Sequence, residues 1–338
     1  MKRVVVTSDL HEADIRPSEL LSEFKRLSIE DAGTFFGDAS KLVEVPNPST
    51  GEGEAVFAFE KDGFRYNLAR DCGSLFVSPR PTKEALQDYY AHSEASSYRV
   101  RHYSRTTAET RRVQLLRSNA LWMAQLIDEA GNPDARSYVD IGTNSPAIFD
   151  EVKALGLFDK LYSLDPLPGL EEECSARGVE IVHEPLRDVG VVTAFHQLEN
   201  QFSPLELMKT ASDMLAIDGL FFMTTRTCTG FDMQMLWDKT PYIFVPEHLN
   251  LLSIDGLNRL VARGGLDLVE LSTPGQLDVE LTRRAVREDP TIELNPFITY
   301  LLEERDTLAH ADFQAFLQKH RLSSHVRVAA ARREGVEV

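Results

Sequence analysis

The chain has 338 residues, and its hydrophobic content of 43% is ordinary for a globular protein with a sizeable buried core. A formal net charge of −17 argues against a nucleic-acid partner, because such binding depends on clustered Lys and Arg. No apolar run approaches the roughly 20 residues of a membrane helix, and we expect no membrane association and no signal peptide. Three widely spaced cysteines suit a reducing compartment, so we expect a cytoplasmic protein without a disulfide framework.

The first part of the chain divides into two predicted segments. Residues 1–54 form an N-terminal extension in which Pro17 to Leu27 can make a short amphipathic helix. Residues 55–81 predict a β-hairpin region, because Asp62-Gly63 supplies the positive φ angles of a tight turn between two apolar runs. A short third strand can follow within this region.

Residues 82–135 are expected to form a helical lid or linker. The pattern predicts a helix over 82–92 with a threonine N-cap, then a loop over 93–103 that is rich in Ser, Tyr, Arg and His. A long helix is predicted over 106–129, and Gly131-Asn132-Pro133 should end it.

The most informative stretch runs from Tyr138 to Asp165. A short apolar strand is followed by a turn at Gly142, a helix that starts near Pro146, and a second strand that ends in an acid. This order predicts the first βαβ unit of a doubly wound sheet, with ligand-binding positions at the carboxyl ends of its strands.

Two ligand classes use such a unit, dinucleotides and S-adenosylmethionine, and a plain βαβ unit without a ligand is the third option. A dinucleotide requires G-x-G-x-x-G, whereas the corresponding positions here hold Gly142, Asn144 and Ala147. Asp140 adds negative charge where a pyrophosphate would lie, so it suits a cationic ligand better. An NAD-dependent oxidoreductase is therefore the least favoured enzyme class.

The pattern continues as an alternation of strands and helices to the end of the chain. This alternation predicts an α/β protein with a doubly wound, Rossmann-like sheet. Residues 276–320 interrupt the alternation as a helical insertion, and its periodic aromatic residues are expected to be core or dimer contacts. The remaining strands are predicted at 179–182, 189–195, 220–225, 266–271 and 325–331.

Several motifs resemble class I S-adenosylmethionine-dependent methyltransferases. Asp140-Ile141-Gly142 resembles their first motif, and Leu215 to Gly219 resembles the turn before their fifth strand. The segments 230–232, 246–250 with Ser253, 272–279 and Ser323 to His325 resemble the substrate side of a bacterial branch that is associated with polysaccharide and sugar modification. The likeness spans residues 55–333, with the methyltransferase-like domain at 136–333.

The resemblance implies a seven-stranded sheet with an antiparallel last strand, S-adenosyl-L-methionine as cofactor, and a sugar or sugar nucleotide as acceptor. Asn144 and Pro146 stand where the family has glycines, and Pro146 removes an amide and adds bulk beside the cofactor's methionine moiety. The cofactor-binding positions that the resemblance implies are Asp140, Gly142, Asn144, Asp165, Pro166, Leu186 and Phe195.

Methyl transfer to oxygen or nitrogen needs a proton acceptor, and histidine near neutral pKa is the usual one. His248, which the resemblance places in a substrate loop, and His196 are the candidate bases. The candidate substrate contacts are Glu199, Arg226, Tyr98 and Tyr242. Arg226 would suit an anionic group of the acceptor.

Relatives often carry a zinc ribbon in the hairpin region, but here Cys72 is the one cysteine left of four ligand positions. One thiol is not a zinc site, so we expect no metal. The missing glycines and zinc ligands also favour an alternative: a catalytically inactive relative that keeps the fold as a binding or scaffold module. A small-molecule partner is expected, and a homodimer stays open.

Overall fold

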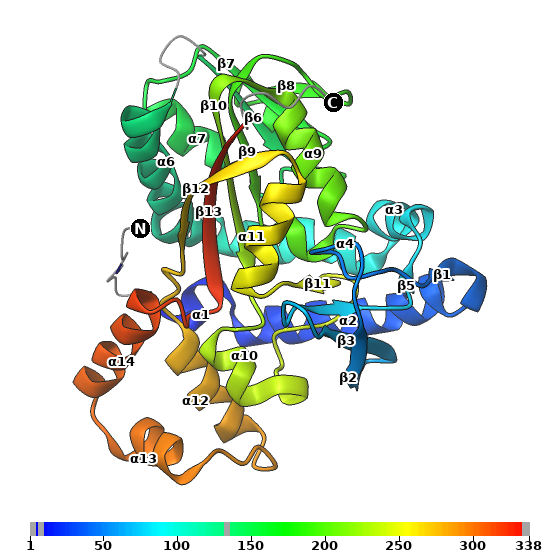
Figure 1. Cartoon of the computed structure of the whole chain (residues 1–338), viewed down its shortest axis with the longest axis vertical. Helices are drawn as coiled ribbons and strands as arrows, with labels where there is room; N and C mark the ends of the chain where they lie inside the picture. Colours follow the sequence, from blue (N-terminus) through cyan, green and yellow to red (C-terminus); the bar gives the residue numbers. More distant parts are fainter. Residues whose placement is uncertain (1–4, 6–9, 132–135, 333–338) are drawn as a thin grey trace.

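The computed structural model describes residues 5, 10–131 and 136–332 and is built around a seven-stranded sheet (Figure 1). The strand order is β12-β13-β10-β9-β6-β7-β8, so the chain order reverses beside β6. All neighbouring strands are parallel except β13, which pairs antiparallel with both β10 and β12. The strands are β6 (Ser137–Ile141), β7 (Lys160–Leu164), β8 (Glu180–Val182), β9 (Val189–Phe195), β10 (Leu215–Arg226), β12 (Leu266–Ser272) and β13 (His325–Arg332).

This sheet confirms the predicted fold class, including the antiparallel last strand. Its central strands are nearly continuous apolar runs, and every residue of β9 is buried. Such runs are typical of parallel strands that are covered on both faces.

Helices cover both faces of the sheet and define two apolar cores (Figure 1). One core contains Met123 and Phe149 from α6 (Arg117–Ala130) and α7 (Ile148–Ala154), with α8 (Glu171–Ser175) at its edge. The other contains Met208 and Leu260 from α9 (Pro204–Met214) and α11 (Ile254–Arg263). Because both faces are covered, a ligand can bind only at the edge of the sheet where the carboxyl ends of the parallel strands lie.

A second, four-stranded sheet with the order β11-β4-β3-β2 packs beside the first. The predicted hairpin is confirmed: β2 (Ala55–Lys61) and β3 (Phe64–Ala69) are joined by Asp62 and Gly63, with φ angles of 51° and 81°. β4 (Leu75–Val77) supplies the third strand, and β11 (Asn250–Leu251) supplies a fourth from the distant substrate-side segment. The predicted cap of α3 (Lys83–His92) is also present, because Thr82 Oγ1 accepts from the Ala85 amide. Two short strands, β1 (Leu42–Val43) and β5 (Arg80–Pro81), pair separately after a turn η1 (Ala39–Lys41).

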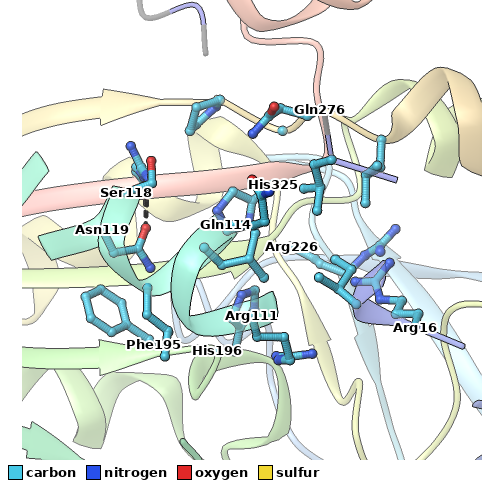
Figure 2. A pocket seen from close by; sticks show the side chains of 18 of the residues that line it. Arg16, Arg111, Gln114, Ser118, Asn119, Phe195, His196, Arg226, Gln276 and His325 are labelled. Carbon is cyan, nitrogen blue, oxygen red and sulfur yellow. Dashed lines mark hydrogen bonds between the residues drawn. The ribbon is translucent and has the colours of Figure 1, made fainter. Parts of the chain in front are cut away.

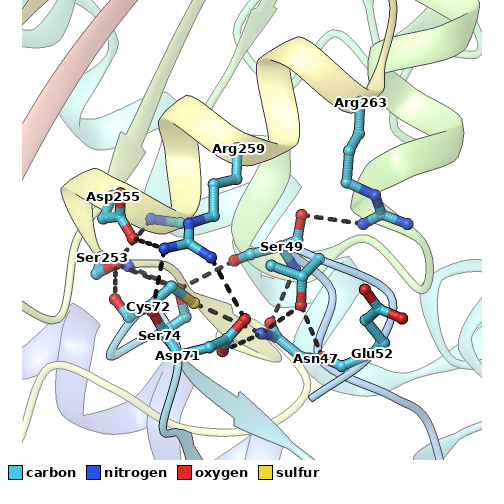
Figure 3. A network of polar contacts seen from close by, with 12 residues as sticks. Asn47, Ser49, Glu52, Asp71, Cys72, Ser74, Ser253, Asp255, Arg259 and Arg263 are labelled. Carbon is cyan, nitrogen blue, oxygen red and sulfur yellow. Dashed lines mark hydrogen bonds and ion pairs between the residues drawn. The ribbon is translucent and has the colours of Figure 1, made fainter.

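A hydrogen-bonded network surrounds Cys72, the one cysteine at the expected zinc-ligand positions (Figure 3). The thiol of Cys72 lies 3.5 Å from Asn47 Nδ2 and donates to Ser74 Oγ at 3.3 Å. Ser253, the N-cap of α11, donates to the Cys72 carbonyl at 2.5 Å and accepts from the Gly256 amide at 2.8 Å. The network ties the loops around the small sheet to α11. Among the described residues, no group of three or more His, Cys, Asp or Glu side chains is arranged to hold a metal ion.

Two predictions about helices are wrong. The N-terminal helix does not end at Leu27, since α2 continues from Ser18 to Phe36 and buries Phe24 and Phe36 against the small sheet. The segment 93–103 is not a loop, because α4 (Glu94–Tyr98) and a π-helical turn η2 (Arg99–Ser104) lead directly into the next helix. Its polar residues gave no sign of helix because they do not form an apolar stripe of their own.

The helix predicted over 106–129 contains α5 (Arg105–Arg111), a second π-helical turn η3 (Arg112–Leu116) and α6. It ends at Ala130 with Gly131 as its C-cap, and the rest of the predicted stop, Asn132 and Pro133, lies outside the described residues. π-Helical turns occur frequently at functional sites, and η3 supplies lining residues to the candidate site below.

The insertion 276–320 is helical as predicted, with α12 (Asp278–Glu288), α13 (Pro296–Glu304) and α14 (Thr307–Lys319). Phe297 and Phe316 are exposed by 68% and 47%, so they are not core contacts in this chain. A homodimer that covers them remains a prediction. No helix among the described residues is long and apolar enough to span a membrane. The remaining elements are α1 (Glu12–Ile15), α10 (Phe231–Leu236) and the turns η4 (Leu198–Asn200) and η5 (Trp237–Lys239).

Candidate functional site

Two concave regions meet at the carboxyl edge of the large sheet. The first, here called the cleft, follows the ends of β6 and β7 and encloses about 1320 Å³, open space at its mouth included. Its lining contains Gly142, Asp165 and Pro166, as the resemblance predicted, together with Leu167 and Pro185. An acid at the tip of the second strand and apolar side chains beside it suit the ribose and the adenine of a nucleoside.

The second region, here called the chamber, consists of two adjoining pockets of about 1000 and 1080 Å³ behind the cleft. Phe195, His196 and Arg226 line it, and so do Glu199 and Tyr242. The N-terminal segment before α2 forms part of the chamber wall, because Ile15 and Arg16 line both of its pockets.

Asn144 connects the two regions. Among the described residues it alone lines the cleft and both pockets of the chamber. Its Nδ2 donates to the Phe195 carbonyl at 3.1 Å, which ties the turn after β6 to the end of β9. Pro146, in contrast, is buried at the start of α7 and lines none of these pockets, so its bulk does not enter the site.

The cleft fits a nucleoside better than it fits the rest of S-adenosylmethionine. Gly142 adopts a φ of +65°, and a Cβ there would lie 2.5 Å from Gln197 Oε1, so the turn requires glycine. The same contact shows that the Gln197 side chain lies against the turn, where its Nε2 donates to the Gly142 carbonyl at 2.6 Å. A ligand that approaches this turn closely must displace Gln197.

Asp165 is exposed but not free of partners. Its Oδ1 lies 2.8 Å from His183 Nδ1, and both side chains face solvent. An exposed pair of this kind contributes little to stability, so it can exchange for hydroxyl groups of a ligand at low cost.

Three predicted site residues do not reach either region. Asp140 is 4% exposed and accepts from Thr193 Oγ1 at 2.6 Å beneath the turn, and its burial raises its pKa to about 6. Leu186 packs on the core beneath the sheet, and Tyr98 packs against His102 with ring centroids 5.1 Å apart. These residues can position the site, but they do not line it.

His196 and Glu199 form the most reactive pair in the chamber. His196 follows β9 in a left-handed conformation with φ of 53°, and its Nδ1 lies 3.3 Å from Glu199 Oε1. Glu199 is 4% exposed; burial acts to raise its pKa, but the hydrogen bond and charge of His196 outweigh burial and lower it. Glu199 therefore stays ionised and can stabilise a protonated imidazole.

The other candidate base, His248, is less suited to that role. It lies in the same chamber, and its Nδ1 lies 3.3 Å from the Phe244 carbonyl. Burial and the nearby charge of Arg226 lower its pKa to about 3. Such an imidazole stays neutral at physiological pH and is a weak proton acceptor.

Arg226 also differs from its expected role. Its guanidinium bonds Asp232 Oδ2 at 2.5 Å, and both side chains are buried. Burial acts to lower the pKa of Arg226, but the charges of Asp232 and Asp278 outweigh it and raise that pKa. The arginine therefore balances buried carboxylates first and is only secondarily available to a substrate.

Several lining residues of the chamber were not singled out as site residues from the sequence. They come from the N-terminal segment, from the helical stretch α5-η3-α6, from the loop before α12 and from the last strand (Figure 2). Gln276 and His325 lie in segments that the resemblance placed on the substrate side. No local pattern identifies the others, because an isolated polar or charged residue usually faces solvent. The residues are Arg16, Arg111, Gln114, Ser118, Asn119, Gln276, His325 and Arg327.

Residues 113–271, which contain the cleft strands and His196, match the family model described as "Methyltransferase domain". No curated protein matches the chain. The solved structures that resemble it include a SAM-dependent methyltransferase from Thermotoga maritima, with 15% identity and a TM-score of 0.40 over 68% of this chain and 98% of that one.

Two further structures give similar values. The cyclopropane synthase MmaA2 from Mycobacterium tuberculosis has 13% identity and a TM-score of 0.40 over 63% of this chain and 84% of that one. Geranyl diphosphate C-methyltransferase from Streptomyces coelicolor, in complex with Mg²⁺, geranyl diphosphate and S-adenosyl-L-homocysteine, has 14% identity and a TM-score of 0.39 over 75% of this chain and 88% of that one. Likeness at these scores does not transfer a substrate or a site.

Proposed function

We propose that this protein transfers a methyl group from S-adenosyl-L-methionine to a small molecule, a sugar or a sugar-linked compound. The observation that carries the proposal is the position of Asn144, which borders both the cleft and the adjoining chamber that contains a histidine–carboxylate pair. A methyltransferase needs adjoining donor and acceptor sites, because the two reactants must meet in line.

The cofactor residues in this proposal are those that line the cleft. Asp165 would accept from the ribose hydroxyl groups, Pro166 and Leu167 would flank the adenine, and Gly142 would allow close approach of the methionine part. When bound, the cofactor supplies an electrophilic methyl group on a sulfonium centre.

The chain's own chemistry is proton removal and positioning in the chamber. His196 would take the proton of an acceptor hydroxyl or amine, and Glu199 would hold the ring and stabilise its positive charge. The amide groups of Gln114, Asn119 and Gln276 can hydrogen-bond to hydroxyl groups of a sugar. Ile15 of the N-terminal segment adds an apolar side chain to the wall of both pockets.

One observation favours a second candidate, a binding module without catalysis. The Gln197 side chain lies on the glycine turn, and His183 pairs with Asp165, so both cofactor-facing groups already have partners within the chain. If these contacts persist, the cleft accepts no cofactor.

Calorimetric titration with S-adenosylmethionine and S-adenosylhomocysteine separates the two candidates. Micromolar binding that Asp165→Ala weakens at least tenfold would support the enzyme and justify a screen of sugars and sugar nucleotides as acceptors. Absence of binding up to millimolar ligand would rule out the enzyme and support the binding module. Asp159→Ala, which removes an exposed carboxylate outside the cleft, is the matched control.

A further inference from the structure

The charge of the chamber is opposite to that of the protein. In a chain with a net charge of −17, the first pocket of the chamber is lined by four arginines and one carboxylate, Asp278. Charged groups are costly to bury unless an opposite charge is nearby. The arginines therefore need partners, either carboxylates of the chain or a bound anion. The four are Arg16, Arg111, Arg226 and Arg327.

Arg226 finds its partners within the chain. It bonds Asp232, and Ser324 donates from its hydroxyl group to both Asp232 and Asp278. Two buried carboxylates thus face one arginine, so this cluster has no positive charge left for a ligand.

Arg327 is different. It is 6% exposed, and its hydrogen bonds go to neutral groups: Nη2 to Ser118 Oγ at 2.9 Å and to Asn119 Oδ1 at 2.8 Å, and Nε to the same Asn119 oxygen at 3.2 Å. Its guanidinium also lies 5.2 Å from the centre of the Trp122 ring. Within the described residues no carboxylate lies within ion-pair distance of it, and Nη1 makes no hydrogen bond.

Arg327 remains charged in this setting. Burial lowers its pKa to about 10, which still leaves it protonated at neutral pH. The charge of the buried Glu270 partly offsets this lowering, but Glu270 forms no ion pair with Arg327. The positive charge also affects the neighbouring His325. Burial and then the positive groups around it, including Arg327, hold the pKa of His325 well below the ordinary value. The chamber thus contains a buried cation whose direct hydrogen-bond partners among the described residues are all neutral.

The other residues of the chamber form the rest of a binding site (Figure 2). Ser118 and Asn119 from α6 lie at one end of the chamber, Arg16 and Arg226 lie at the other, and His196 and His325 lie between them. Apolar side chains fill the walls. They are Leu10, Ile15, Leu115, Leu116, Phe195, Leu277 and Leu281.

We propose that the chamber binds a small organic oxyanion, a carboxylate or a phosphate, whose charged group pairs with Arg327. The guanidinium fork suits either oxyanion, because it donates two parallel hydrogen bonds. The apolar walls take the body of the molecule, and Arg16 adds attraction from the N-terminal segment. That this anion is the methyl acceptor rests on the proposed function; that it binds does not.

The test uses the full chain without cofactor at neutral pH and three probes of one shape: naphthoate, naphthyl phosphate and the neutral naphthamide. Fluorescence titration should show that at least one anion binds about tenfold or more tightly than the amide, as expected for a charge-assisted hydrogen bond in a buried site. The tighter anion tells whether the natural group is a carboxylate or a phosphate. Arg327→Gln should reduce the preference to less than about threefold and leave naphthamide binding unchanged.

Arg136→Gln, which removes an exposed arginine that lines neither pocket of the chamber, should keep the preference and serves as the matched control. Equal binding of all three probes would overturn the proposal, and so would a preference that survives Arg327→Gln. If that variant does not fold, Arg16→Gln decides instead: a threefold or greater loss of anion binding supports the site, and no loss overturns it. Because the titration contains no cofactor, its failure is separate from failure to bind S-adenosylmethionine.

Discussion

His196 Nδ1 lies 3.3 Å from Glu199 Oε1, at a point where the chain leaves β9 in a left-handed turn. Glu199 Oε1 also accepts from the Arg226 amide at 3.0 Å, while its Oε2 is buried without a hydrogen-bond partner among the described groups. The carboxylate is thus fixed by the end of β10 and oriented toward one imidazole. This relationship makes His196, rather than His248, the base in the proposed reaction.

The first prediction concerns the choice of base. With an acceptor found by screening, His196→Gln should lower kcat about a hundredfold or more, because a positioned base contributes that much to proton transfer. His248→Gln should change kcat less than about threefold, since the low pKa of His248 already excludes it from proton transfer. Methyl transfer from labelled cofactor measures both. A larger loss in the His248 variant would reverse the assignment.

The second prediction concerns the glycine turn. Gln197→Ala removes the side chain that lies on Gly142 and should tighten binding of S-adenosylhomocysteine about three- to tenfold, because the ligand no longer displaces it. Gly142→Ala should abolish binding, since the added Cβ meets Gln197 at 2.5 Å and the φ is positive. Calorimetry gives both values, with Gln201→Ala, which removes another glutamine of the cleft lining, as control. Weaker binding in Gln197→Ala would mean that this amide is itself a cofactor ligand.

The third prediction concerns Asp140 and pH. Burial raises its pKa to about 6 in the folded protein, against roughly 4 in an unfolded chain, so the folded state binds more protons between these values. Ionising the buried carboxyl therefore lowers the free energy of unfolding as pH rises from about 4 to about 6. Above pH 6 this loss of stability has reached its full size. Asp140→Asn should raise the free energy of unfolding by up to about 3 kcal/mol at pH 7 or above. Near pH 4 the two proteins should be equally stable.

Urea denaturation across this pH range measures the effect. Asp159→Asn, which removes an exposed carboxylate, should not reproduce the pattern. A gain in stability that is the same at all pH values would show that Asp140 is not the titrating group.

The fourth prediction concerns the hydrogen-bonded network around Cys72. Ser253→Ala removes the N-cap of α11 and its bond to the Cys72 carbonyl, and should cost about 1–3 kcal/mol of stability. Gly256→Ala should also destabilise, because its Cβ would lie 2.0 Å from Ser74 Oγ. Thermal unfolding with and without a zinc chelator should give the same Tm. A chelator that lowers Tm would show that the protein holds a metal after all.

Much of the fold was determined by the sequence itself. Asp62-Gly63 determined a hairpin, because that pair adopts the two positive φ angles of a tight turn. The apolar runs determined the strands of the large sheet, and the carboxyl ends of parallel strands had to place Gly142, Asp165 and His196 at one edge. These features depend on turn geometry and on the periodicity of apolar residues, and both can be recognised in one amino-acid sequence.

Only the tertiary structure decided what the site contains. Ser118 and Arg327 are 209 positions apart and meet because β13 enters the sheet beside β10 with α6 across it. Arg16 reaches the chamber because Glu12, 1% exposed, docks the N-terminal segment against Arg284 and Tyr242. Gln197 covers Gly142 because the sheet brings the ends of β9 and β6 together. Such contacts depend on which side chains the packed elements bring within a few ångströms, and no periodicity in the sequence records that distance.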